Sequence, residues 1–338
     1  MPIPRYEKQI LDCTTPLNLE SLIGKSVVVT GGAMGLGREY VKSFAAAGFV
    51  LFRLLNAARF PDIDTGYSAY VTFGDINETQ SAALTEELPG KVQFVKCDVR
   101  SWEDQVRLFE AAISSSPSKS CDIVIANAGI LGPDAMGKIT DPSLPPPKPD
   151  TSIIDINLIG LLYTAKLATH YFRRQQDDNT RDRCLILKSS LGGYLDQAGS
   201  PFYCASKFAV RGLMRSLRRT SWLESIRVNL VAPWYAAVFI SIDEMIIETP
   251  LIGDLFAQYL ASRGIKFASK EDACAAMLRI ASDRTVNGRS LAVVNREDCP
   301  EGYLDLDQDD FPENTLLRSL QDAALHATPG LDLLFLTC

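Results

Sequence analysis

The sequence has 338 residues, 46% of them hydrophobic and 22% charged, which is typical of a globular protein that can bury a sizeable core. Its net charge of −7 and the lack of a clustered basic face argue against a nucleic-acid partner. Eight cysteines without a C-x-x-C pair, with only two histidines, favour reduced thiols in a cytoplasmic protein over a disulfide framework or a metal site. We find no secretory signal and no apolar run of about 18 residues, so no membrane partner is expected.

Residues 1–24 are expected to form an irregular leader, after which strand-like and helix-like segments alternate. The expected strands are 25–30, 71–74, 92–97, 123–126, 184–188, 227–231 and 290–294. The expected helices are 38–47, 78–88, 102–114, 153–175 and 203–221. Strands separated by helices predict an α/β fold, a doubly wound parallel sheet with helices on both faces, in one domain over residues 25–299. Residues 300–338 are expected to form an acidic, solvated tail beyond the sheet.

A glycine-rich turn, Thr30–Gly37, lies between the first expected strand and the first expected helix. Glycines let the backbone turn sharply and approach a pyrophosphate, whose charge is favoured at the N-terminus of a helix. A glycine cluster alone is weak support because loops are often rich in glycine, but the strand and the helix beside it favour a nucleotide site. The candidate nucleotide contacts are Gly31, Gly35, Leu36 and Gly37.

Asp75 closes the second expected strand. An acidic residue there can accept hydrogen bonds from both ribose hydroxyls and repel the 2′-phosphate of NADP. The sequence therefore predicts NAD as the cofactor. An N-cap of the following helix is the other role open to Asp75, and both roles can hold together.

The spacing between Gly37 and Asp75 is about twice the usual spacing of about 20 residues, and removing residues 49–68 restores it. We therefore interpret residues 49–68 as an insertion, either a surface excursion or translated intron sequence. A rival assignment places the second strand at residues 49–55, but it would leave the cofactor without a well-placed acid.

Tyr203 and Lys207 lie on one face at the start of an expected helix, because residues four apart are neighbours on a helix surface. A free tyrosine has a pKa of about 10, but a nearby ammonium and an oxidised nicotinamide ring would favour the phenolate needed for acid–base work. The Tyr-x-x-x-Lys pattern alone is common on surface helices. Ser190, at a strand end before Tyr203, strengthens the assignment because its hydroxyl could bind the substrate oxygen; a helix or turn cap is its alternative role.

Two asparagines are further candidate site residues. Asn127 closes a strand together with Gly129, and Asn157 lies early in the long expected helix. Capping of nearby backbone groups is the alternative role for both asparagine side chains.

These motifs, in this order and spacing, resemble the motif set of the short-chain dehydrogenase/reductase family over about residues 25–294. The resemblance implies a single seven-stranded Rossmann domain, usually a homodimer or homotetramer packed through two long helices. It implies that Tyr203 is the general acid or base and that Lys207 lowers its pKa and holds the ribose. It also implies that Ser190 positions the substrate and that Asn157 orders a water in a proton relay. The implied cofactor contacts are Gly31, Gly35, Leu36, Gly37, Asp75, Asp98 at the adenine, Asn127, Gly129, Tyr203, Lys207 and Pro233.

Within the family, residues 189–191 and 201–207 are similar to the 15-hydroxyprostaglandin dehydrogenase group. Residues 231–234 resemble fungal members of that group, many of which work in natural-product pathways.

The segment after Pro233 departs from the family pattern Pro-Gly-x-x-x-Thr. Trp234 stands at the glycine position, and Val238 stands where the family has a threonine that hydrogen-bonds the cofactor. Backbone groups could still hold the nicotinamide carboxamide. This departure and the insertion together leave room for an enzyme with impaired cofactor binding.

Residues 239–265 are expected to form a substrate lid, rich in Ile, Leu, Phe and Met beside Trp234 and Tyr235. An apolar substrate would suit this lid, and packing of the same side chains on the core or across a subunit interface is an equal alternative. The leading hypothesis is NAD-linked oxidation of a secondary alcohol in a hydrophobic small molecule. A ketone reductase with the same site is its nearest rival. A catalytically silent fold used for binding or scaffolding is the rival from another class.

Overall fold

The computed structural model describes residues 9–56, 69–132, 136, 141, 143–175, 182–235 and 254–326. The strands in chain order are β1 (Ser26–Thr30), β2 (Tyr70–Asp75), β3 (Val92–Lys96), β4 (Ile123–Ala126), β5 (Cys184–Lys188), β6 (Arg227–Pro233), β7 (Ser290–Val293) and β8 (Tyr303–Asp305). The α-helices are α1 (Gly35–Asn56), α2 (Glu78–Glu87), α3 (Trp102–Ser115), α4 (Ser152–Ile154), α5 (Leu161–Arg174), α6 (Pro201–Leu217), α7 (Asp254–Ser262), α8 (Lys270–Ser282) and α9 (Leu316–His326). The shorter turns are η1 (Glu20–Leu22), the π-helical η3 (Asp155–Gly160), η4 (Leu191–Gly193) and η5 (Ser221–Glu224).

The strands form one sheet in the order β3-β2-β1-β4-β5-β6-β7-β8. Neighbouring strands run parallel except for β7 and β8. Unbroken apolar runs such as Val27–Val29 are buried, because helices cover both faces of the sheet. The strand order reverses at β1, which lies between β2 and β4, so the carboxyl ends of these strands open the crevice in which α/β folds bind ligands. The predicted doubly wound parallel sheet is confirmed.

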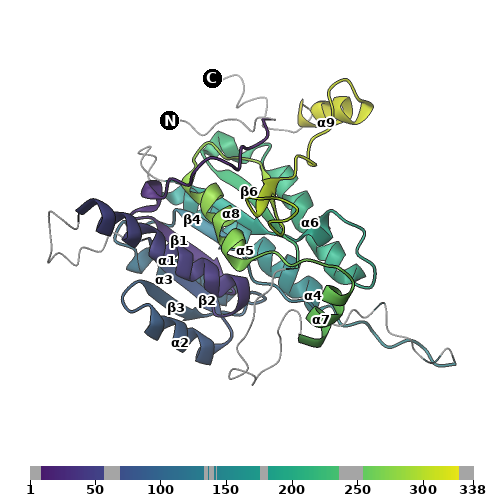
Figure 1. The fold of residues 1–338 in the computed structure, drawn as a ribbon, viewed down its shortest axis with the longest axis horizontal. Coiled ribbons are helices and arrows are strands. Elements are labelled where there is room, and N and C mark those ends of the chain that lie inside the picture. The colour runs from purple at the N-terminus through teal and green to yellow at the C-terminus, as the bar shows by residue number, and fades with distance from the viewer. Residues whose placement is uncertain are drawn as a thin grey trace.

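Two apolar clusters lie on opposite faces of this sheet. One face carries α1, α2 and α8, with Phe44, Leu84 and Met277 fully buried. The other face carries α3, α5 and α6, with Phe109 and Phe172 fully buried. Figure 1 shows α1 and α8 side by side across the front of the sheet, and α9 set apart from the body. Because the helices cover both faces, the carboxyl ends of the strands remain as the place for a ligand site.

The first helix is longer than the sequence predicts. It does not end near Ala47 but continues to Asn56, so the first part of residues 49–68 extends α1. One glycine costs a helix only about 1 kcal/mol, and the chain from residue 49 to 60 holds no proline that would stop it. Strand β2 starts at Tyr70, so the choice of residues 71–74 over the rival strand is confirmed. Residues 57–68 lie outside the described part, and the insertion stays a prediction.

The expectation of a solvated tail after residue 300 is wrong for its first part. Tyr303–Asp305 forms β8, an eighth strand antiparallel to β7, where the family resemblance implied seven strands. The acidic side chains here are buried because arginines pair with them. Arg289 contacts Asp305 at 2.6 Å, and Arg211 contacts Asp309 at 2.6 Å. Such pairing compensates the desolvation of the carboxylates.

The described part of the leader is irregular apart from η1, as expected, yet it packs on the body. Leu22 is buried, and Leu11, Leu17 and Leu19 lie against the cluster on the α1 face. The backbone N–H of Leu11 donates to Asp305 at 2.9 Å, so the leader and β8 hold each other in place.

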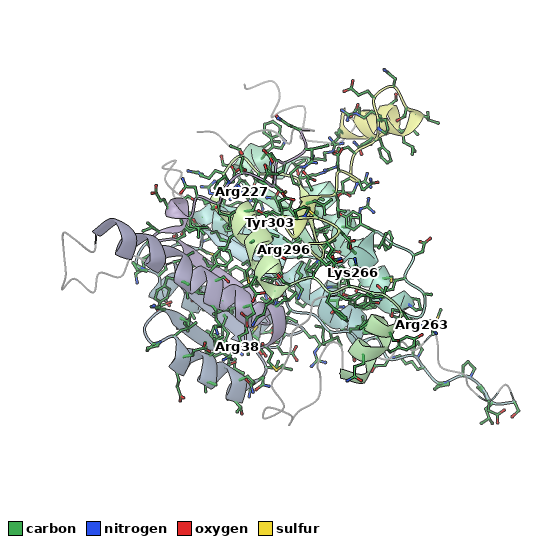
Figure 2. The ribbon with its side chains drawn as sticks, viewed as in Figure 1. Arg38, Arg227, Arg263, Lys266, Arg296 and Tyr303 are labelled. Atoms are coloured by element: carbon green, nitrogen blue, oxygen red, sulfur yellow. The ribbon has the colours of Figure 1, made fainter. Side chains whose placement is uncertain are left out.

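Arg227 joins the sheet to α8 from its buried position at the start of β6 (Figure 2). Its guanidinium pairs with Asp182 at 2.6 Å and donates to the carbonyls of Ile280 and Val286. Because these three partners are buried, the network fixes α8 against the sheet end opposite the ligand crevice.

One helical stretch of the described residues, Ser152–Arg174, is long and apolar enough by composition to cross a membrane. The stretch is partly buried, because it packs against α3 and α6. A long core helix of a folded domain has the same composition.

Replacing Asp305 with Asn should lower the free energy of unfolding by about 3 kcal/mol, because the buried Arg289 guanidinium loses its closest carboxylate. Asp307→Asn is the matched control. Asp307 also contacts Arg289, at 3.2 Å, but is 40% exposed, so its loss should cost less than about 1 kcal/mol. Urea unfolding followed by circular dichroism measures both variants, and equal losses would contradict a core position for β8.

Candidate active site

The glycine turn lies at the carboxyl edge of β1 and opens α1. Gly31 N donates to Gly74 O at 2.7 Å, which ties the turn to β2. Gly31 and Gly35 have φ of +67° and +57°, which L side chains rarely adopt. A Cβ on Gly37 would lie 1.9 Å from Gly31 O, whereas a Cβ on Gly35 would meet no atom within 4 Å. The turn is thus tightly packed at Gly37 and has open space at Gly35. This shape fits a dinucleotide pyrophosphate at the helix N-terminus.

Asn127 supports this turn from β4. Its Nδ2 donates to Thr30 O at 2.8 Å and to Gly31 O at 2.9 Å, and its Oδ1 accepts from Lys188 Nζ at 2.9 Å. The amide is therefore engaged by the protein on both ends. Its predicted contact with the cofactor stays a prediction.

Asp75 lies beside the turn with its carboxylate buried. Oδ2 accepts from Ala33 N and Oδ1 from Asn77 N, each at 2.9 Å. The N-cap role considered for Asp75 is wrong, because the cap of α2 is Asn77, whose side chain accepts from the N–H of Gln80. Arg38 of α1, labelled in Figure 2, pairs with Glu87 at 2.7 Å, so its guanidinium does not neutralise the Asp75 carboxylate at the turn.

Asp98 follows β3 on the same edge of the sheet. Its hydrogen bonds from the Arg100 side chain hold the pKa of the Asp98 carboxyl below its usual range. An adenine contact by Asp98, as the resemblance implies, would share the carboxylate with Arg100.

Asn157 lies in the π-helical turn η3, and π turns often mark functional sites. Its Oδ1 accepts from Ile130 N at 2.8 Å, and its Nδ2 donates to Ile130 O at 2.9 Å and Ser206 Oγ at 3.3 Å. A Cβ on Gly129 would lie 3.1 Å from Asn157 Oδ1 and 3.5 Å from Lys207 Nζ. The structure therefore brings Asn157, Gly129 and Lys207 together.

Tyr203 and Lys207 lie in the first turns of α6, with Lys207 Nζ 5.5 Å from the centroid of the tyrosine ring. Ser190 follows β5, and its hydroxyl lies close enough to the Tyr203 phenol to act on its pKa and donates to Pro233 O at 3.3 Å. It also accepts from Gly192 N at 3.1 Å, so Ser190 fills its alternative capping role as well. All four candidate catalytic side chains thus meet at the carboxyl ends of β4 and β5.

Burial controls the protonation of this group. It raises the pKa of the Tyr203 phenol, and the Ser190 hydrogen bond offsets only part of that effect. It also lowers the pKa of Lys207 to about 7, with the charge of Lys188 adding to the decrease. Desolvation thus disfavours both charged forms, and the expectation that Lys207 lowers the pKa of Tyr203 stays a prediction. An oxidised nicotinamide ring supplies a further positive charge when bound.

Lys188 is the site residue that the sequence reasoning missed. It closes β5, its carbonyl accepts from Lys207 Nζ at 3.4 Å, and burial lowers its pKa to about 8. The available signal was a lysine at the end of the otherwise apolar strand CLILK, two residues before Ser190.

An aromatic wall follows β6. The rings of Trp234 and Tyr235 meet edge to face at 4.6 Å, and the Phe267 ring lies 6.4 Å from Tyr235. The Tyr235 hydroxyl accepts from Gln197 at 3.0 Å and lies close enough to Tyr203 to raise the pKa of its phenol further. Of the predicted lid, α7 and residues 263–265 are described, while Val238 and residues 239–253 lie outside the described part.

The family model for short chain dehydrogenases matches residues 64–243, beginning inside the segment where the spacing departs from the family. The chain is 36% identical to the 5′-hydroxyaverantin dehydrogenase of Dothistroma septosporum, over 87% of this chain and 90% of that protein. It belongs to the short-chain dehydrogenase/reductase family. This dehydrogenase is also 34% identical to the 5′-hydroxyaverantin dehydrogenase of Emericella nidulans, over 86% of this chain and 90% of that protein.

The NADP-dependent dehydrogenase M3 of a Phoma species is 30% identical, over 85% of this dehydrogenase and 79% of that protein. A short-chain type dehydrogenase/reductase from Mycobacterium marinum has the same fold, with a TM-score of 0.63 and 22% identity over 83% of this chain and 98% of that one. The predicted family is thus confirmed, and the protein is an oxidoreductase with a nicotinamide cofactor. The finer likeness to the 15-hydroxyprostaglandin dehydrogenase group stays a prediction.

Replacing Gly37 with Ala should weaken cofactor binding by about a hundredfold, because the new Cβ overlaps Gly31 O and forces the turn open. Gly212→Ala in α6 is the matched control, since a Cβ there meets no atom within 4 Å. Fluorescence titration with the reduced cofactor measures the affinity, and circular dichroism checks folding. Unchanged affinity in folded Gly37→Ala would count against the turn as the pyrophosphate site.

Proposed function

We propose that this dehydrogenase oxidises a secondary alcohol in a hydrophobic small molecule of natural-product biosynthesis, with NAD as the hydride acceptor. The observation that carries the proposal is the cluster of Tyr203, Lys207 and Ser190 beside the aromatic wall of Trp234 and Tyr235. Two similar fungal proteins are named for a hydroxylated substrate, 5′-hydroxyaverantin, which supports an alcohol here.

In this mechanism Ser190 and Tyr203 bind the same substrate oxygen, since their hydroxyls lie within hydrogen-bonding reach of each other. Tyr203 accepts the alcohol proton as the alcohol becomes a ketone, and a bound oxidised nicotinamide would supply the hydride acceptor. Positive charge on Lys207, when it is protonated, would favour the phenolate that accepts this proton. Asn157 ties the π turn to the backbone of Ile130. This keeps Gly129, the residue before Ile130, next to the Lys207 ammonium. The aromatic wall excludes water and favours apolar substrates.

Asp75 supports NAD over NADP. Its carboxylate is held at the turn by the N–H groups of Ala33 and Asn77, where a 2′-phosphate would meet a buried negative charge. The relative from Phoma is named NADP-dependent, so cofactor choice varies among similar proteins. The choice made by this chain is therefore assigned to Asp75.

We further propose a cytoplasmic homodimer or homotetramer that packs through α5 and α6. Leu162 of α5 and Phe208 of α6 are 36% and 43% exposed, and such apolar surface favours association. The cysteines of the described residues are free thiols, in keeping with a reducing compartment.

Asp75→Asn should raise the affinity for NADP relative to NAD by about tenfold, because it removes the negative charge but keeps an oxygen that accepts from Ala33 N. Asp98→Asn is the matched control, because the Asp98 charge is already compensated by Arg100 and should leave the preference unchanged. Isothermal titration with each oxidised cofactor gives the ratio. Tighter binding of NADP than NAD by the unchanged protein would overturn the assignment.

Tyr203→Phe should lower kcat for alcohol oxidation by at least about a thousandfold while cofactor affinity stays unchanged, because only the proton-accepting hydroxyl is lost. Tyr235→Phe is the matched control and should change mainly KM, since this hydroxyl bonds Gln197 rather than Ser190. Hydride transfer from 5′-hydroxyaverantin and simpler aromatic secondary alcohols is followed at the absorbance of the reduced cofactor. Retained turnover in Tyr203→Phe would refute the mechanism.

A further inference from the structure

Lys188 and Lys207 form a pair of ammonium groups at the carboxyl end of β5. The carbonyl of Lys188 accepts from Lys207 Nζ at 3.4 Å, and Lys188 Nζ donates to Asn127 Oδ1 at 2.9 Å. Burial lowers the pKa of both lysines, and no carboxylate counteracts that decrease for either. Among the described residues no carboxylate forms an ion pair with either lysine, and their hydrogen-bond partners are neutral amide and backbone oxygens, so positive charge on the pair is uncompensated.

The nicotinamide end of the cofactor has to lie next to this pair. Hydride transfer needs the ring carbon within about 3.5 Å of the substrate carbon whose oxygen faces Ser190 and Tyr203. Ser190 lies two residues after Lys188, and Lys207 lies on the same helix face as Tyr203. Asp75 lies beyond β1 on β2, which assigns the opposite end of the crevice to the adenosine half.

We propose that the Lys188 ammonium makes the site discriminate between the two redox forms of the cofactor, binding the reduced form more tightly than the oxidised form. The proposal rests on the proposed function, since it needs a nicotinamide beside Tyr203. The oxidised ring carries a positive charge and the reduced ring is neutral, so an uncompensated ammonium repels only the oxidised form. Weaker repulsion after hydride transfer favours alcohol oxidation on the enzyme.

Two neutral variants separate this charge effect from a supporting role for Asn127. Lys188→Gln keeps a hydrogen-bond donor and Lys188→Met has none, yet both should lower the ratio of Kd for NAD to Kd for NADH by about tenfold at pH 7. Lys119→Met is the matched control. It removes an exposed ammonium before β4, at the opposite edge of the sheet, and should leave the ratio unchanged.

Isothermal titration and NADH fluorescence give the two dissociation constants for each full-length variant. A purely supporting role predicts that Lys188→Met weakens both forms equally and that Lys188→Gln leaves both unchanged. An unchanged ratio in both variants would overturn this proposal and leave the proposed function intact. Failure of the unchanged protein to bind either form would overturn the proposed function, and this proposal with it.

Discussion

The side chain of Asn127 connects the parts on which the site depends. Its amide bonds the carbonyls of Thr30 and Gly31 and the ammonium of Lys188, so one buried group links the ends of β1, β4 and β5. The glycine-rich turn depends on this link at Gly31. A Cβ on Gly37 would lie 1.9 Å from Gly31 O, so Gly37 and Asn127 together hold that carbonyl in place. A buried network with every member paired specifies one arrangement, since each lost bond would leave a desolvated polar group. Asn127 thereby fixes the position of the glycine-rich turn relative to Lys188 and its neighbour Lys207.

Burial, rather than a contact between opposite charges, sets the pKa values of Tyr203 and Lys207 on α6. Desolvation favours the neutral phenol of Tyr203 and lowers the pKa of Lys207 to about 7, so Lys207 carries its positive charge only part of the time near neutral pH. Added positive charge beside these groups would favour the phenolate of Tyr203, which accepts the alcohol proton, and the neutral amine of Lys207. An oxidised nicotinamide carries such a charge. The apparatus thus responds to the redox form of its cofactor, and Asp75 keeps the negative charge at the far end of the crevice.

The sequence predicted the sheet well because buried parallel strands are continuous apolar runs, and it predicted the site because those runs end at one edge. The sequence predictions failed where contacts between residues far apart in the chain determine the structure. Asp305 has the composition of a solvated tail, and only its pairing with Arg289 places β8 in the sheet. Gly48 did not end α1, because local propensity is weak beside continued packing. Lys188 was overlooked because its role depends on contacts with Asn127, after β4, and Lys207, on α6, which the strand pattern does not contain.

The extra residues after α1 bear directly on whether the enzyme is impaired. A helix that follows a parallel strand runs back along the sheet, so α1 starts at the turn and ends at the opposite edge (Figure 1). Residues 49–56 therefore lengthen the helix at the end far from the crevice. Strand β2 still pairs with β1 in register from Ser26 with Tyr70 to Thr30 with Gly74, which brings Asp75 to the turn despite the added chain. The added length thus leaves the cofactor cradle unchanged, and the hypothesis of a silent scaffold loses one of its two supports.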